Sequence, residues 1–331
     1  MKSRKKVVRR APRYARLSRL ESLEVGRSPN FEQLEARRPP GMIGRPLRLR
    51  GQRLESRLVL ANLLVDNPLD TVVASELSLR QAIAQANLDA AAGISDTIAF
   101  DASLASQTIT LTQGPLELNG TGAGTITIDG GGQMAVSGNS QTGVFTVDSG
   151  AQVSIAGLTI EDGNSTSGGG IDNEGTLTVT NSTLSGNEAV DEGGGIYNAS
   201  GSSLTVSNCT LADNSAEDGG GIDNEGTLTV TNSTIANNSG SQGGGLANLL
   251  NGSATLNNTI VAANTAVTGP DVSGAFISQG NNLTGATDGS SGWVGADLTG
   301  TRRPARSTPG ASGQLRRPDA NDGAVARESR Y

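Results

Sequence analysis

The chain of 331 residues contains no histidine and only one cysteine, Cys209. Without histidine there can be no Ser-His-Asp triad, no imidazole acid or base and no His-ligated zinc site. One cysteine cannot form an internal disulfide or a cysteine-cluster metal site. Aromatic residues make up 2% of the chain, so a core must be built from small aliphatic side chains. Its 11 prolines are too few for a collagen-like chain or a Pro-rich linker.

Positive charge is missing from the long central part of the chain. Residues 81–301 contain 21 Asp and Glu but no Lys or Arg, whereas residues 1–60 contain 17 Lys and Arg against 5 Asp and Glu. A body without cations cannot hold phosphates, so we expect it to bind no nucleic acid. The alternative for the basic N-terminal segment, which we call the leader, is an arm that binds nucleic acid.

Long apolar stretches are also missing. No window contains 18 consecutive apolar residues, so we expect no transmembrane span. A twin arginine, Arg9-Arg10, lies in the leader, but the apolar segment of an ordinary secretory signal does not follow it.

The central part is instead an internal repeat. Gly-Gly-Gly recurs at 168–170, 193–195, 219–221 and 243–245, at spacings of 25, 26 and 24 residues. Each unit contains three short apolar or alternating runs, separated by Gly, Asn, Asp and Ser, and no 3.6-residue period appears. Three strands in about 25 residues are typical of one coil of a right-handed parallel β-helix, whose coils bury a core only by stacking.

Asparagines recur at three places in each unit. Asn favours left-handed turns, and stacked Asn side chains can hydrogen-bond along a ladder, so we interpret all three sets as structural. The three sets are Asn173, Asn198, Asn224 and Asn248; Asn181, Asn208, Asn232 and Asn258; and Asn187, Asn214, Asn238 and Asn264. Glycine triplets at the same period indicate tight turns with positive φ.

The repeat resembles that of the polymorphic outer-membrane proteins, a family of bacterial surface and adhesin β-helices. Their GG-A-I and F-x-x-N motifs are similar to GGGI and to Leu184–Asn187, Leu211–Asn214, Ile235–Asn238 and Val261–Asn264. An aliphatic residue replaces the family's aromatic residue in each copy. The resemblance implies a β-helix at a bacterial surface.

Two further resemblances lie upstream of the repeat. Ser78–Asn87 is similar to the opening segment of many secreted β-helix proteins, with Leu77 in place of a Cys, and Ser78 is a candidate N-cap. We expect a helix at 76–90 to cap the first coil, which would start at 96–101. Phe31–Arg37 and Leu54–Leu60 resemble the L-E-x-R-x-L-L motif of exported planctomycete-type proteins, which implies export.

The last 30 residues differ sharply in composition from the repeat. Residues 302–331 contain 7 Arg against 3 Asp and Glu. Residues 280–301 resemble the closing segment of such surface proteins, and a reading of the following codons one nucleotide later permits that family's usual continuation. We therefore expect a disordered tail that arose by a frameshift, with a native basic tail as the alternative.

Parallel β-helices of the pectin-lyase-like class include polysaccharide-degrading enzymes. A lyase needs a cation or base against the substrate carboxylate, which residues 81–301 do not contain. A hydrolase needs a pair of carboxylates, one with a raised pKa. Asp and Glu are available for that purpose, but most recur with the repeat, which favours a solvated face: Asp172, Glu174, Asp191, Glu192, Asp218, Asp223 and Glu225.

Calcium is the cation that such acids would bind. Asp172, Glu174, Asp223 and Glu225 are the candidates, since both pairs occupy copies of the same IDNEG turn. Coils two apart lie about 10 Å from each other, which is too far for one shared ion. We expect no other cofactor.

The sequence thus predicts an all-β, right-handed parallel β-helix at 96–301. A cap with a short helix at 62–95, a basic disordered leader at 1–61 and a tail at 302–331 complete the domain organisation. The predicted function is a non-catalytic, adhesin-like protein, secreted or at the cell surface or outer membrane, that binds glycans or other surface proteins. The alternatives are a carbohydrate-active enzyme with a carboxylate-only site and a spacer that binds nothing.

Overall fold

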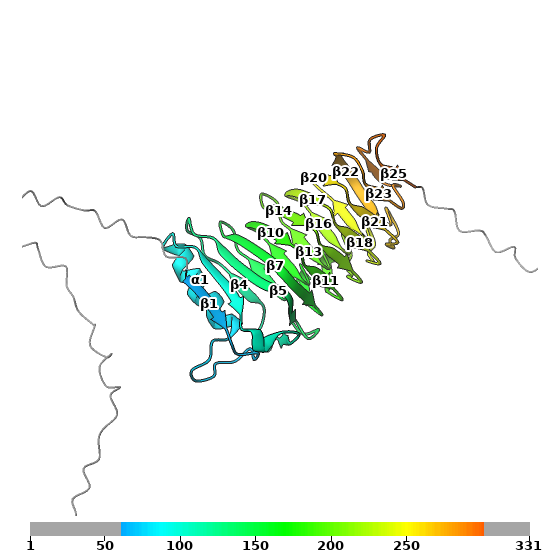
Figure 1. Ribbon diagram of the computed structural model, residues 1–331. Coiled ribbons are helices and arrows are strands. Elements are labelled where there is room, and N and C mark those ends of the chain that lie inside the picture. Colours follow the sequence, from blue (N-terminus) through cyan, green and yellow to red (C-terminus); the bar gives the residue numbers. More distant parts are fainter. Residues whose placement is uncertain (1–60, 301–331) are drawn as a thin grey trace, which may run out of the picture. The chain divides into compact units, whose positions relative to one another are not determined.

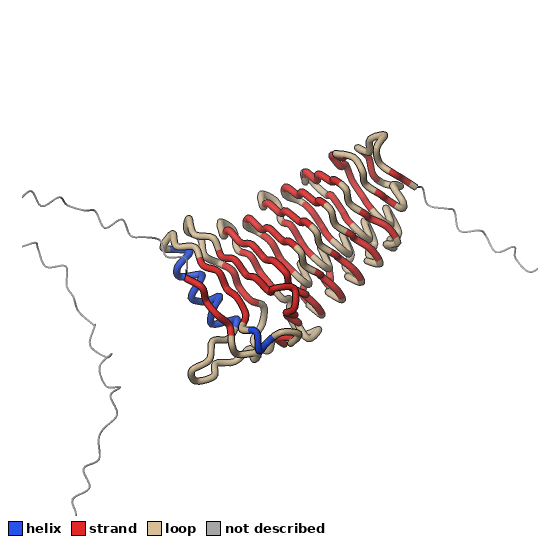
Figure 2. The backbone as a smooth tube through the Cα atoms, viewed as in Figure 1, coloured by secondary structure: helices blue, strands red, loops and turns tan. Residues whose placement is uncertain are grey.

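The computed structural model describes residues 61–300. The expected leader, its export motifs and the tail at 302–331 lie outside the described residues. The described part is a stack of about seven turns in which neighbouring strands run parallel. The turns follow one another from β1 and α1 at one end to β25 at the other (Figures 1 and 2).

Each turn contributes one strand to each of three faces. In one typical turn these strands are β9 (Ile171–Asn173), β10 (Thr176–Thr180) and β11 (Thr183–Ser185). We number the faces first, second and third in that order. Side chains alternate along each strand, so that Leu177 and Val179 of β10 are buried while its threonines face outward.

The remaining strands occupy the same three faces. The first face contains β4 (Leu116–Leu118), β6 (Phe145–Val147), β13 (Ile196–Asn198), β16 (Ile222–Asn224), β19 (Leu246–Asn248), the first part of β22 (Val272–Ser278) and β24 (Ser290–Ser291). The second contains β1 (Ala61–Val65), β2 (Asp96–Phe100), the first parts of β5 (Ile126–Ser137) and β7 (Gln152–Glu161), β14 (Ser203–Ser207), β17 (Thr227–Thr231), β20 (Ser253–Asn257) and the end of β22. The third contains β3 (Thr108–Thr110), the ends of β5 and β7, β15 (Thr210–Ala212), β18 (Thr234–Ala236), β21 (Ile260–Ala262), β23 (Leu283–Thr284) and β25 (Leu298–Thr299).

The register of the strands keeps equivalent residues of the repeat in columns. On the first face Ile171 pairs with Ile196, and Ile196 pairs with Ile222. These side chains are fully buried, and each touches the next turn, so the aliphatic core is continuous along the stack. A turn that shifted by one residue would move its core side chains to the surface, which fixes the register.

The cap contains a helix, α1 (Leu79–Ala91), three residues later at its start than expected. Ser78 is its N-cap: its side chain accepts a hydrogen bond from the amide of Gln81, whose side chain accepts one from the amide of Ser78. The helix buries Leu79, Ile83 and three alanines against the core. The stack itself begins upstream of the helix, because β1 pairs in parallel with β2 over residues 61–65 and 96–100. No helix within residues 61–300 is long and apolar enough to cross a membrane.

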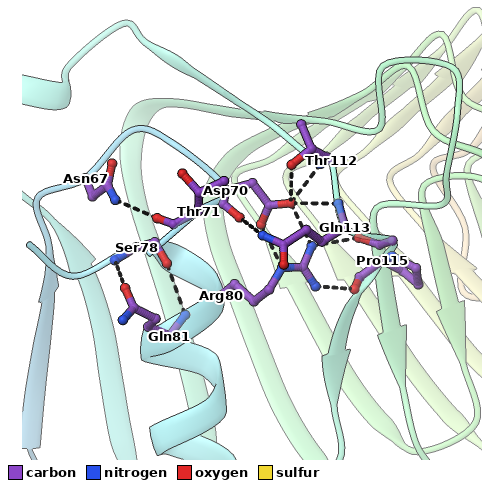
Figure 3. Close-up of polar contacts among 10 residues, drawn as sticks. Asn67, Asp70, Thr71, Ser78, Arg80, Gln81, Thr112, Gln113 and Pro115 are labelled. Atoms are coloured by element: carbon purple, nitrogen blue, oxygen red, sulfur yellow. Dashed lines mark hydrogen bonds and ion pairs between the residues drawn. The ribbon is translucent and has the colours of Figure 1, made fainter. Parts of the chain in front are cut away.

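An ion pair within the cap is hydrogen-bonded to the backbone of the first turns (Figure 3). Arg80 donates two hydrogen bonds to the carboxylate of Asp70, at 2.7 and 3.0 Å, and others to the carbonyls of Gly114 and Pro115. Burial raises the pKa of Asp70, but the hydrogen bonds from Arg80 and from the amide of Thr112, together with the Arg80 charge, leave it below its ordinary value. The single cation of residues 61–300 is therefore fully engaged.

Two of the three asparagine sets form hydrogen-bonded ladders inside the stack. Asn173 donates to Asn198 at 2.7 Å, and Asn198 donates to Asn224 at 2.6 Å. In the second ladder Asn187 donates to Asn214 and Asn214 to Asn238, both at 2.9 Å. The side chains also bond backbone groups of neighbouring turns, so the buried polar atoms at these corners are satisfied.

The set formed by Asn181, Asn208, Asn232 and Asn258 differs from the other two. These residues are exposed, with φ between 48° and 55°. One side-chain hydrogen bond links members of the set, from Asn258 to Asn232. Their main contribution is the left-handed turn that Asn accepts at low cost.

The glycine triplets combine two requirements. The first glycine of a triplet has positive φ, as at Gly219 with 60°. The second does not, but a Cβ on Gly220 would lie 2.2 Å from the carbonyl oxygen of Ser239 in the next turn. The triplet therefore lets the backbone turn and also lets successive turns approach closely.

The far end of the stack carries the one tryptophan of the chain. Its ring stacks on Phe276 of β22 at a centroid distance of 5.6 Å, and its indole N–H donates to Ser290. Trp293 thus packs against the core at this end.

We predict that Asn214→Ala destabilises the stack by about 3 kcal/mol, because the backbone N–H of Asn187 loses its acceptor and the side chain of Asn187 keeps only its hydrogen bond to the carbonyl of Ile160. Urea unfolding of the full chain measures the change. The control is Asn208→Gly at an exposed left-handed turn, which we expect to change stability by less than about 0.5 kcal/mol. Equal losses in both variants would contradict the ladder.

Candidate functional site

Acidic residues gather on the outer side of the first face. Register places seven residues in one outward column: Glu117, Thr146, Asp172, Tyr197, Asp223, Ala247 and Ser273. Asp172 and Asp223 are thus the strand neighbours of Tyr197 on either side. Beside this column lie Glu174 and Glu225, two positions further along the chain, and Glu192 and Asp218, which precede glycine triplets. We call Asp172, Glu174, Glu192, Asp218, Asp223 and Glu225 the acidic face.

Asp223 is the most unusual member of the acidic face. Its exposed fraction is 0%, and neither carboxylate oxygen has a hydrogen-bond partner. The turn at Gly219 packs directly on its backbone. Burial, followed by the charges of Asp218, Glu225 and Glu192, raises its pKa to about 8, and the nearby amide of Asn224 offsets only part of the rise.

Asp172 occupies the same position in an identical IDNEG turn but is only half-buried. Burial, with the charges of Glu174, Glu192 and Asp148, raises its pKa to about 6. Its Oδ1 atom is buried without a hydrogen-bond partner. The two aspartates also differ in their strand neighbours: Asp172 has Thr146 and Tyr197, whereas Asp223 has Tyr197 and Ala247.

Tyr197 separates the two aspartates. Its hydroxyl donates a 3.1 Å hydrogen bond to Glu225. Burial and the charges of Glu225 and Glu192 raise the pKa of the Tyr197 phenol above its ordinary value. The phenol therefore stays protonated and acts as a donor.

Glu192 and Asp218, the other two positions of the acidic face, lie directly before the glycine triplets. They form a parallel bridge between adjacent turns, and β12 (Glu188–Glu192) also pairs with β8 (Asn164–Ser167). Glu192 accepts a 2.9 Å hydrogen bond from the Ser167 hydroxyl. Burial, with the charges of Glu217 and Glu192, raises the pKa of Asp218.

The residues expected to bind calcium are thus placed in two groups. Asp172 with Glu174 and Asp223 with Glu225 lie on opposite sides of Tyr197, two strand spacings apart. Glu192 and Asp218 were not among those candidates; their place just before Gly193 and Gly219 is the signal that could have found them. In the described part of the chain, no three Asp, Glu or Cys side chains already have metal-binding geometry.

A second surface feature covers the outer side of the second face. One column consists of Ser154, Thr178, Thr205, Thr229 and Thr255, paired strand by strand. The columns on either side are also rich in Thr and Ser: Gln152, Thr176, Ser203, Thr227 and Ser253, and Ala156, Thr180, Ser207, Thr231 and Asn257. We call these three columns the hydroxyl face. Its hydroxyls repeat at about 4.8 Å along the stack.

A shallow cavity of about 400 Å³ lies beside α1, between Arg80, Asn87 and Glu117. The Arg80 guanidinium that borders it is already bound to Asp70 and two carbonyls. The cavity therefore offers no free cation to an acidic substrate.

Comparison with known families matches residues 118–266 to a family model described as a right handed beta helix region. The fold is a right-handed parallel β-helix. Neither the curated proteins nor the solved structures gave a match to this chain. The matched segment of the β-helix includes the whole acidic face and the whole hydroxyl face.

We predict that the β-helix loses stability as pH rises from about 4.5 to 8.5. Asp223 and Asp172 have pKa values of about 8 and about 6 in the folded protein, against an ordinary 3.8. Both carboxyl groups therefore ionise at a lower pH in the unfolded chain than in the folded protein, and their ionisation favours unfolding. Asp70 and Asp297 have lowered pKa values, so their protonation decreases stability as pH falls, and this occurs only at more acidic pH.

Thermal melts of the full chain in EDTA measure this dependence. Asp223→Asn should flatten the fall of Tm with pH, because the amide cannot ionise. Asp191→Asn, at an exposed acid next to Glu192, should keep the slope of the unmodified protein. An unchanged slope in Asp223→Asn would contradict the burial of this carboxylate.

Proposed function

We propose that the chain is a non-catalytic, exported cell-surface protein of the adhesin type, and that its hydroxyl face binds neutral glycan chains. The observation that carries this proposal is the periodicity of that face. Equivalent hydroxyls repeat over five successive strands, from β7 to β20. A repeating surface suits a repeating ligand, because the same weak contact is made at each step.

The charge of the β-helix supports a neutral ligand. Residues 81–300 contain no cation, and the acidic face lies on the neighbouring strands of the same turns. Uronates and sulfated glycans would meet repulsion without a compensating ion pair. Export to the cell surface or outer membrane is supported by the resemblances of the repeat and of the leader.

The alternative is a polysaccharide hydrolase, favoured by the raised pKa values of Asp172 and Asp223. Two carboxyl groups that flank one site are the requirement for that reaction. The burial of Asp223 opposes this alternative, since a fully buried carboxyl cannot reach a glycosidic oxygen.

Binding and cleavage can be measured together on the full chain. We expect retention on insoluble neutral polysaccharides, no retention on polyuronates in EDTA and no release of reducing ends. Thr205→Lys in the centre of the hydroxyl face should weaken retention about fivefold, a loss of about 1 kcal/mol. Thr210→Lys, the same change on β15 of the same turn, should leave it unchanged.

Two results would contradict the proposal. Equal retention by Thr205→Lys and the unmodified protein would remove the hydroxyl face as the contact. Release of reducing ends that disappears in Asp172→Asn would instead support the hydrolase.

A further inference from the structure

The inward side of the third face changes its residue type in the last described turns. From β11 to β21 its central inward positions are aliphatic and fully buried: Leu184, Leu211, Ile235 and Val261. The positions that follow in the same column are Thr284 in β23 and Thr299 in β25. The Thr284 hydroxyl is buried without a hydrogen-bond partner. The inner side of this face therefore becomes polar where β23 and β25 extend the stack.

The outward side of the same strands changes in the opposite sense. From β11 to β18 one outward column consists of threonine: Thr183, Thr210 and Thr234. It continues as Ile260 in β21, Leu283 in β23 and Leu298 in β25. These three side chains are 44%, 39% and 70% exposed. We call them the apolar stripe, which runs over β21, β23 and β25 at the far end of the stack (Figure 1).

Such an inversion is typical of strands whose outer side is covered. Successive side chains of a strand point to opposite faces, so an apolar outer side indicates a second buried surface. Single exposed aliphatic residues are common, but a contiguous row of them marks an interaction site. The members of the apolar stripe are paired in register and lie about 4.8 Å from one another.

The segments of the chain outside the described residues are poorly suited to cover the apolar stripe. Residues 302–331 follow β25 but contain three prolines, and their large aliphatic residues are Leu315 and Val325 alone. Proline cannot donate to a strand ladder, and a segment with so few apolar side chains gains too little by becoming ordered. Residues 1–60 join the stack at β1, at its opposite end (Figure 1).

A second copy of the chain carries a surface that matches the stripe. In a two-fold contact the same surface meets itself, so Ile260 of one copy would lie against Leu298 of the other, with Leu283 against Leu283 on the axis. The strands β21, β23 and β25 contain no charged residue. The neighbouring Asp297 already accepts hydrogen bonds from Ser278 and Asn282 of its own copy.

The charges of the chain are also compatible with this contact. Residues 302–331 contain 7 Arg against 3 Asp and Glu, whereas residues 81–300 contain acids and no cation. The segment that follows the stripe in one copy is therefore opposite in sign to the β-helix of the other. This attraction offsets the repulsion between two acidic β-helices.

We propose that the apolar stripe joins two copies of this chain in a two-fold dimer. The stripe lies on the third face, whereas the hydroxyl face proposed to bind glycans lies on the second. Either proposal can therefore fail without the other.

Sedimentation velocity of the full chain over a range of concentrations tests the dimer. A small interface predicts a reversible dimer with a Kd of about 1 to 100 μM. Leu283→Thr should weaken it at least tenfold, because each dimer loses two apolar side chains at the axis. The change introduces the residue that the repeat carries in β15 and β18, so the far-UV circular dichroism of the variant should be unchanged.

Val267→Thr is the matched control. Val267 is 78% exposed and lies between β21 and β22, outside the stripe. Its replacement removes an exposed aliphatic side chain elsewhere on the surface and should keep the Kd of the dimer within twofold.

Two outcomes would overturn the proposal. One is a dimer that Leu283→Thr and Val267→Thr weaken equally, which would place the contact elsewhere. The other is a chain that stays monomeric at about 1 mM, well above the Kd expected of such an interface. In that case, binding of the apolar dye ANS that Leu283→Thr removes would show an uncovered stripe, and no dye binding would show that the chain's own residues cover it.

Discussion

Hydrogen bonding between successive turns, strand to parallel strand in fixed register, is the constraint on which the rest of this structure depends. A single turn of about 25 residues has three strands of three to five residues and cannot bury its own core. Stacking supplies both the backbone partners and the aliphatic contacts. It also explains the glycine triplets and the two asparagine ladders, which allow close approach at the corners and satisfy their buried polar atoms.

The same register determines the surface. Any residue type that recurs in the repeat becomes a column on the outside of the β-helix. Threonine and serine at one set of positions form the hydroxyl face, and aspartate and glutamate at another form the acidic face. Like charges are thereby held about one strand spacing apart, where burial and the neighbouring charges together raise the pKa values of Asp218 and Asp223. With Arg80 engaged by Asp70, no side chain of residues 61–300 neutralises them.

The repeat period made much of the fold predictable. The spacing of the glycine triplets gave the length of a turn, and the recurrence of Asn187, Asn214 and Asn238 indicated a ladder. The exposed Asn208 looked equivalent because local sequence does not show which corner faces inward. The sequence also did not show that the stack starts at β1. Residues 61–65 pair with residues 96–100, and a helix lies between the two segments in the chain. Asp172 and Asp223 occupy identical IDNEG turns, so only their neighbours in adjacent turns separate a half-buried acid from a buried one.

The central claim is that the stack buries an uncompensated carboxylate at Asp223. Its most direct test is a titration of the side-chain carboxyl carbons by NMR on calcium-free protein, with Asp223→Asn used to assign the resonance. We predict that the Asp223 carboxyl titrates with a pKa of about 8, far above the ordinary 3.8. Titration near the ordinary value would contradict it, because it would place the carboxylate in water or beside a partner.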